Sequence, residues 1–92
     1  MHILVEHQIK YLNRRLHEIE ELKLFLLNNQ FDEIYIIGHK LKGNGETFGY
    51  AEIGEFGKTL ECASSEKNKE KISETIELLA RFVEKNLLVK GL

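Results

Sequence analysis

A histidine, a lysine and a glycine are spaced so that they would share one face of a helix. His39, Lys42 and Gly43 occupy positions i, i+3 and i+4, which are neighbours on a helix surface. A neutral imidazole is a good nucleophile near pH 7, so a ring nitrogen could attack a phosphoryl group. Lys42 could then offset the charge of the transferring phosphoryl oxygens, and Gly43 would let a partner's active site approach closely.

Glycines are frequent around this histidine and carry an energetic cost. Gly43, Gly45 and Gly49 follow His39 within or at the end of an amphipathic segment. Each glycine inside a helix costs about 1 kcal/mol relative to alanine. A chain that keeps such glycines beside an outward histidine and a lysine is expected to use that surface.

Helical geometry separates the core face of this segment from its outward face, because an α-helix advances about 100° per residue. With Ile34 at zero, the residues within about 60° form the predicted core face: Ile37, Leu41 and Phe48. The polar residues then fall at larger angles on the same scale, about 80° for Lys42, 120° for Glu46, 140° for His39 and 180° for Gly43.

Two larger side chains flank His39 on the predicted outward face. Tyr35 and Ile36 lie near 100° and 200° on the same scale. Apolar residues on a polar helix face can mark a docking surface. They can equally pack against the first or third helix, because a bundle helix has two neighbours, and the pattern leaves both interpretations open.

Four amphipathic segments predict the helices that position these residues. Their approximate ranges are Ile3–Asn28, Glu33–Phe48, Ala51–Ala63 and Lys69–Leu88. Asp32 is a plausible N-cap for the second helix, and Gly49 is a natural stop. The first segment carries an apolar stripe in which Lys23 fills one skipped turn: Val5, Ile9, Leu12, Leu16, Ile19 and Leu26.

The length and pattern of the chain predict an all-α fold, an antiparallel up-down four-helix bundle. The 92 residues suit one domain, and we expect a monomer. Proline is absent, which favours long uninterrupted helices. No segment shows sustained strand alternation.

Composition argues against several classes of protein. The 13 basic and 15 acidic residues give a net charge of −2, which is not the basic footprint of a nucleic-acid-binding protein. No apolar run approaches the length of a membrane span, and nothing at the start reads as a signal peptide. Cys62 is the lone cysteine, as expected in a reducing cytosol.

Other charged residues carry weaker indications. The histidines of the chain are His2, His7, His17 and His39. No pair of them stands at i, i+4 with a third ligand nearby, so we expect no metal site. Arg14 and Arg15 could contact acidic partners, but a solvated helix face paired with Glu18 is the preferred interpretation.

The segment from His39 to Gly49 resembles the signature of histidine-containing phosphotransfer (HPt) domains, roughly H-x-L-K-G-x-[GSA]-x-x-[FLV]-G. The chain matches every constrained position of that signature: His39, Leu41, Lys42, Gly43, Gly45, Phe48 and Gly49. The resemblance extends to a four-helix layout along nearly the whole chain. A P-loop interpretation of the glycines fails, because no Gly-Lys-Ser/Thr follows a strand.

The resemblance implies a role for each matched residue. His39 would accept a phosphoryl group and exchange it with the aspartate of response-regulator receiver domains in a multistep phosphorelay. Lys42 would contact the phosphoryl group, Gly43 would give the receiver room, and Gly49 would shape the turn between the second and third helices.

A glutamine on the third helix of many HPt domains holds the other ring nitrogen of the histidine, and Glu61 stands at that position here. Its carboxylate could orient the imidazole of His39. It could equally be a surface glutamate in a salt bridge, with Lys58 as partner. Both interpretations stay open.

The implied partners are a receiver domain and a sensor or hybrid histidine kinase. No nucleotide-binding motif is present, so we expect a phosphoryl carrier rather than an enzyme, without a cofactor of its own. Magnesium would belong to the receiver's aspartate site. The alternative is a structural or docking bundle that kept the fold and lost the phosphorylation.

Overall fold

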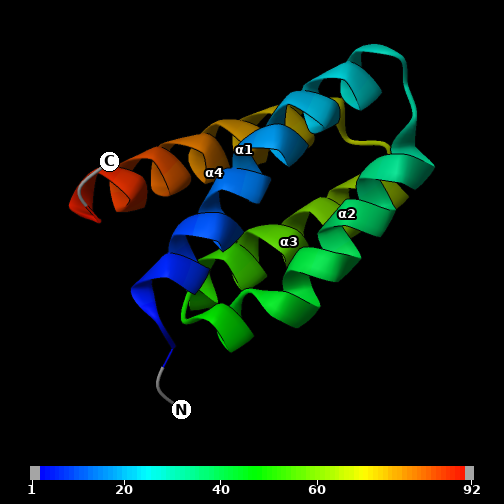
Figure 1. Ribbon diagram of the computed structural model, residues 1–92. Coiled ribbons are helices and arrows are strands. Elements are labelled where there is room, and N and C mark those ends of the chain that lie inside the picture. Colours follow the sequence, from blue (N-terminus) through cyan, green and yellow to red (C-terminus); the bar gives the residue numbers. More distant parts are fainter. Residues whose placement is uncertain (1–2, 91–92) are drawn as a thin grey trace.

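The computed structural model describes residues 3–90 and is built from helices alone in that range (Figure 1). The elements are α1 (Val5–Leu27), α2 (Phe31–Asn44), a short 3₁₀ helix η1 (Glu46–Phe48), α3 (Ala51–Ser65) and α4 (Lys69–Val89). This confirms the predicted all-helical class with four α-helices. No helix in this range has the length and hydrophobicity that crossing a membrane requires.

The helices pack around one apolar core. In sequence order each helix contacts the next, and α4 returns to contact α1, so every helix has two neighbours. Figure 1 shows α1 beside α4 and α2 beside α3. The core contains fully buried side chains from all four helices: Leu12, Leu22, Ile34, Leu41, Ile53, Leu60, Ile72, Leu79 and Val83.

The apolar stripe of α1 differs from the prediction at two positions. Leu22 is completely buried, whereas the predicted stripe skipped that turn and assigned it to Lys23, which is exposed. Val5 is 54 % exposed rather than part of the core. The physical reason is that α1 packs against both α2 and α4, so it needs a face wider than a single row of residues.

The second helix ends earlier than predicted. It stops at Asn44, and the chain continues through the separate 3₁₀ turn of η1. Gly49 then adopts a left-handed conformation with φ of 87°, which glycine accepts without strain. The backbone N–H of Tyr50 returns to the carbonyl of Gly45 at 2.9 Å, so the turn is closed by hydrogen bonds of its own.

The start of α2 also differs from the prediction. Asp32 does not cap the helix, because the helix already begins at Phe31 and the capping position is Gln30. No side chain caps this terminus. Asp32 and Glu33 instead lie in the first turn, where negative charge favours the helix dipole.

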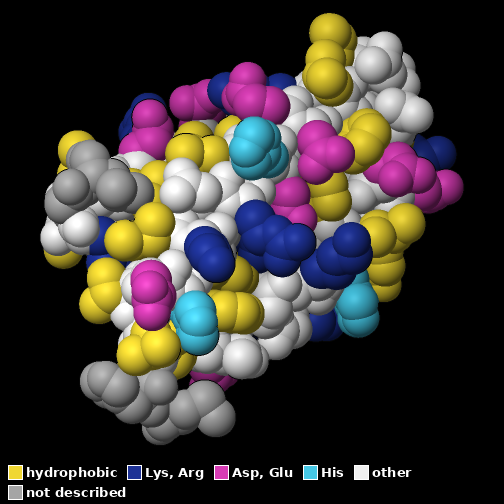
Figure 2. Space-filling view, in the orientation of Figure 1, with side chains coloured by type: hydrophobic (Ala, Val, Ile, Leu, Met, Phe, Trp, Pro, Cys, Tyr) yellow, Lys and Arg dark blue, Asp and Glu magenta, His cyan; other side chains and the backbone are white. Residues whose placement is uncertain are grey.

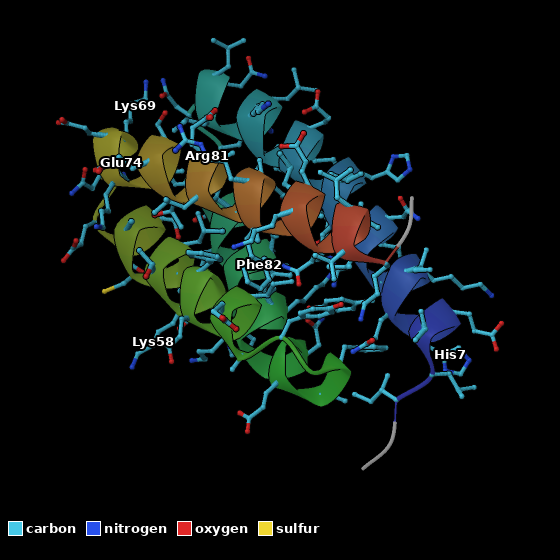
Figure 3. The ribbon with its side chains drawn as sticks, turned by 90° about the vertical axis from the view of Figure 1, so that its left-hand side faces the viewer. His7, Lys58, Lys69, Glu74, Arg81 and Phe82 are labelled. Atoms are coloured by element: carbon cyan, nitrogen blue, oxygen red, sulfur yellow. The ribbon has the colours of Figure 1, made fainter. Side chains whose placement is uncertain are left out.

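Aromatic rings fill the end of the core near η1. Phe48 stacks on Tyr11 of α1 with ring centroids 4.4 Å apart. Phe82 of α4 meets the edges of Tyr50 and Phe56, each at 6.0 Å, and Figure 3 shows it between α4 and the rest of the bundle. Phe48 is partly buried and packs against the core, and it does so from η1 rather than from α2 as predicted.

Helices α2 and α3 approach each other closely because glycines face the contact. A Cβ atom added to Gly57 would lie 2.6 Å from the backbone nitrogen of Lys42, and one added to Gly38 would lie 2.8 Å from that of Glu61. A Cβ on Gly45 would meet the backbone nitrogen of Gly54 at 2.5 Å. These distances are too short for any side chain, so the two backbones touch directly.

We expect Gly57→Ala to destabilise the protein and Gly43→Ala to stabilise it. The Gly57 substitution forces the two helices apart, at an expected cost of about 1–3 kcal/mol. Gly43 is helical, with no atom within 4 Å of an added Cβ, so alanine there should add about 0.4–1 kcal/mol. Urea denaturation of both variants checks this. Equal free energies of unfolding would contradict the close-packing interpretation.

Candidate functional site

Glu61 of α3 joins the two polar residues that the sequence singles out on α2. One carboxylate oxygen, Oε2, lies 2.5 Å from Nδ1 of His39. The other, Oε1, accepts a hydrogen bond from Nζ of Lys42 at 2.9 Å. The contact with His39 is the one expected of an imidazole-orienting residue, and the bridge to Lys42 is an ion pair. Glu61 therefore contacts His39 and Lys42 at once, and its ion-pair partner is Lys42 rather than the Lys58 of the second interpretation.

The chemistry of the carboxylate fixes the tautomer of His39. Hydrogen bonds from Lys42 and then from His39 hold the pKa of Glu61 below its usual range. The carboxylate is therefore ionised at neutral pH and can only accept hydrogen bonds. We accordingly assign the ring hydrogen of His39 to Nδ1, which leaves the lone pair on Nε2.

His39 and Lys42 are more exposed to solvent than Glu61. His39 is 65 % exposed and Lys42 is 42 % exposed, whereas Glu61 is only 15 % exposed. The hydrogen bond to Glu61 also raises the pKa of Lys42, which keeps the ammonium group charged. The site thus presents an imidazole and a cation to the outside, with the carboxylate beneath them.

Gly38 and Gly57 determine how closely Glu61 approaches His39. Gly38 precedes His39 and abuts the backbone of Glu61 directly. Gly57 lies one turn before Glu61 and touches the backbone of α2 at Lys42. Sequence reasoning missed both positions, although a glycine next to the histidine and another at i−4 from Glu61 were visible in the sequence.

The glycines after His39 serve different purposes. Gly43 is exposed, and a Cβ there would meet nothing within 4 Å. Gly45 is buried against α3, and Gly49 permits the turn. Of these three glycines, Gly43 alone lies on the open side of the site.

Tyr35 and Ile36 are exposed beside the site. Tyr35 is 41 % exposed and Ile36 is 47 % exposed, so neither is a core residue of the bundle. The ring of Tyr35 lies parallel to that of His39, with centroids 6.3 Å apart and planes 7° apart. The surface around His39 therefore includes one aromatic and one aliphatic side chain.

Two further predictions about neighbouring residues need correction. Glu46 lies on η1, beyond the end of α2, so helical arithmetic does not place it near His39. It is exposed, but no contact joins it to the site. Lys58 is not the ion-pair partner of Glu61, because Glu61 points to α2 and pairs with Lys42 instead.

Arg15 is not on a solvated face, in contrast to the prediction. It is 6 % exposed, and its guanidinium lies 4.3 Å from the centre of the Tyr11 ring. The predicted pairing with Glu18 is confirmed, with Nε and Oε1 2.8 Å apart. Arg14, the neighbouring residue, is exposed as expected.

No cluster in residues 3–90 offers three histidine, cysteine or acidic side chains arranged to hold a metal ion. His2 lies outside the described residues. His7 and His17 are exposed on α1.

We expect the Glu61 carboxyl group to titrate below the usual range, and Lys42→Met to raise its pKa. The depressed folded-state pKa means that this group's contribution to stability is complete above the unfolded-state pKa and is lost as pH falls through the folded-state pKa. Carbon-13 NMR of the side chain measures the titration. Lys40→Met is the matched control and should leave it unchanged. A wild-type pKa in the ordinary carboxyl range would contradict the bridge.

Comparisons with protein-family models, curated proteins and solved structures found no match to this chain. The motif from His39 to Gly49 and the geometry around it therefore carry the functional interpretation.

Proposed function

We propose that this protein is a histidine phosphotransfer protein, which accepts a phosphoryl group on His39 and exchanges it with the aspartate of response-regulator receiver domains. The observation that carries the proposal is the contact of Nδ1 of His39 with Glu61 at 2.5 Å, on a side chain that is 65 % exposed. An oriented, exposed imidazole beside a lysine is the arrangement that the HPt-like motif requires.

The accepting step begins with the lone pair on Nε2 of His39. Nε2 attacks the phosphorus of the partner's aspartyl phosphate, the N–P bond forms, and the P–O bond to the aspartate breaks. The aspartate leaves as a carboxylate with the electron pair of that bond. The hydrogen on Nδ1 stays in place, so the phosphorylated ring carries a positive charge that the Glu61 carboxylate stabilises.

The return step is the same path in reverse. A receiver's aspartate carboxylate attacks the phosphorus, the N–P bond breaks, and its electron pair returns to Nε2. The carboxylate of Glu61 has two opposing effects on this equilibrium. It stabilises the positive ring, and it repels the phosphoryl oxygens if they approach it.

Lys42 is the residue that can moderate that repulsion. Its ammonium group is bound to Oε1 of Glu61 at 2.9 Å, next to His39 on the same helix face. A phosphoryl group on Nε2 would offer it competing anionic oxygens. Lys42 would then lie between the phosphoryl group and the carboxylate and screen one from the other.

The proposal extends to partners, location and the finer fold. The partners are a receiver domain, which supplies its own magnesium site, and a sensor or hybrid histidine kinase. The kinase, not this chain, would use ATP as the phosphoryl donor. A cytoplasmic monomer is consistent with the free exposed thiol of Cys62. The short connections at 28–30, 45–50 and 66–68 favour antiparallel neighbours in an up-down bundle.

The decisive experiment is transfer from phosphorylated receiver domains of the source organism. We expect acid-labile label on the wild-type protein and none on His39→Ala. Since His39 is an exposed residue, its loss should leave the circular dichroism spectrum unchanged. The absence of label with every receiver would favour the alternative, a docking bundle without phosphorylation.

Gly43→Leu should block transfer while leaving the fold intact. Gly43 is exposed and no atom lies within 4 Å of an added Cβ, so leucine would project into the space that the partner must enter. Initial transfer rates measured with the same receiver check this, with Gly43→Ala as the smaller control. A wild-type rate in the leucine variant would refute the close-approach requirement.

A further inference from the structure

Two adjoining hollows lie between α1 and α2. The hollows have volumes of about 230 and 450 Å³, and Arg14, Arg15 and Asn44 line both of them. Lys10 lines the first and Lys40 lines the second. We call these four cations, Lys10, Arg14, Arg15 and Lys40, the basic stripe. Figure 2 shows a row of Lys and Arg side chains across this face.

Most of the basic stripe makes no close ion pair, although the charges of Lys40 and Arg14 also act on the Glu18 carboxylate. Arg15 is bound to Glu18, but within residues 3–90 no ion pair involves Lys10, Arg14 or Lys40. Glu21 is the other carboxylate lining these hollows. The whole chain has a net charge of −2, so this local excess of positive charge is not a consequence of composition.

Tyr11 positions two residues that line the hollows, Asn44 and Arg15. The hydroxyl of Tyr11 donates a hydrogen bond to Oδ1 of Asn44 at 2.6 Å, and the Tyr11 ring supports the guanidinium of Arg15. The carbonyl oxygen of Asn44 is thus occupied, whereas no hydrogen bond within residues 3–90 involves its side-chain amide N–H groups, which can donate to a ligand. The groups facing outward are thus mainly hydrogen-bond donors, which suits carboxylates.

The stripe borders the phosphoryl-acceptor site on one side only. On α2, the exposed Gly43 and Ile36 lie between His39 and Lys40 around the helix, and Lys40 also follows His39 in sequence. On the opposite side, Lys42 is neutralised by Glu61. A partner that covers His39 therefore meets four cations against the two carboxylates of Glu18 and Glu21 on the α1 side. On the α3 side the lining charges balance, with three lysines and three glutamates.

We infer that the receiver partner docks with an acidic rim of its surface on the basic stripe, spanning α1 and α2 across the open surface of Gly43. This inference rests on the proposed function and adds the direction from which the partner approaches. Complementary charge at the edge of an interface acts mainly on encounter and orientation rather than on chemistry. The stripe should therefore determine the apparent KM for the receiver and not the maximal transfer rate.

The test compares charge reversal on the two sides of His39. The variant Arg14→Glu/Lys40→Glu should raise the apparent KM for the receiver about tenfold or more at low salt, with an unchanged rate at saturation. The matched control is Lys58→Glu/Lys71→Glu, which makes the same charge change at the hollow beside α3, where Lys58 of α3 and Lys71 of α4 both form part of the lining. It should change KM by less than about twofold. Figure 3 shows Lys58 projecting outward from α3.

A second measurement does not need the receiver. Nitrogen-15 NMR titration of the wild-type protein with a hexaglutamate peptide should shift amide signals near Lys10, Arg14 and Lys40. Added salt and the Arg14→Glu/Lys40→Glu variant should both abolish these shifts. Circular dichroism of each variant checks that the fold is retained.

The possible outcomes separate the two proposals. Equal KM values for the wild-type protein and Arg14→Glu/Lys40→Glu would overturn the docking inference and leave phosphotransfer standing. Peptide shifts that are absent, or that persist in the variant, would overturn it as well. A wild-type protein that takes no label from any receiver would overturn the proposed function, and the docking inference with it.

Discussion

The direct contact between the backbones of α2 and α3 is the constraint on which the site depends. Glu61 belongs to α3 and His39 to α2, and their 2.5 Å contact forms where the two helices lie closer than side chains normally permit. Gly38 and Gly57 remove the atoms that would prevent this. The glycines weaken each helix in isolation, and the tight packing that they allow offsets that cost.

The same contact gives the site its division of charge. One carboxylate, shielded beneath the surface, holds both an imidazole and an ammonium group. The imidazole is thereby fixed in one tautomer and the lysine in one position. On the α1 side, by contrast, the four cations of the basic stripe outnumber the two carboxylates beside them, so the surface around His39 is electrically asymmetric. A site that is neutral on one flank and basic on the other can orient a partner as well as bind it.

The sequence was sufficient to predict the four helices and the exposed positions of His39 and Lys42 on the second of them. Periodicity predicted four helices, and the spacing of His39 and Lys42 placed them on the outward face of α2. It could not decide where α2 ends, because the stop at Asn44 depends on how Gly45 packs against Gly54. It could not choose between Lys42 and Lys58 as the partner of Glu61 either, since that choice depends on the separation of two helices.

The atoms that surround Gly38 and Gly57 also limit how this chain can change. The nearest neighbours of an added Cβ at either position are main-chain atoms, and these are present whatever residue occupies the neighbouring site. A clash with a side chain can be relieved by a smaller residue opposite, but a clash with a peptide unit cannot. No second substitution can therefore compensate for a side chain at either position. Other residues of the α2–α3 contact can change, but these two must remain glycine.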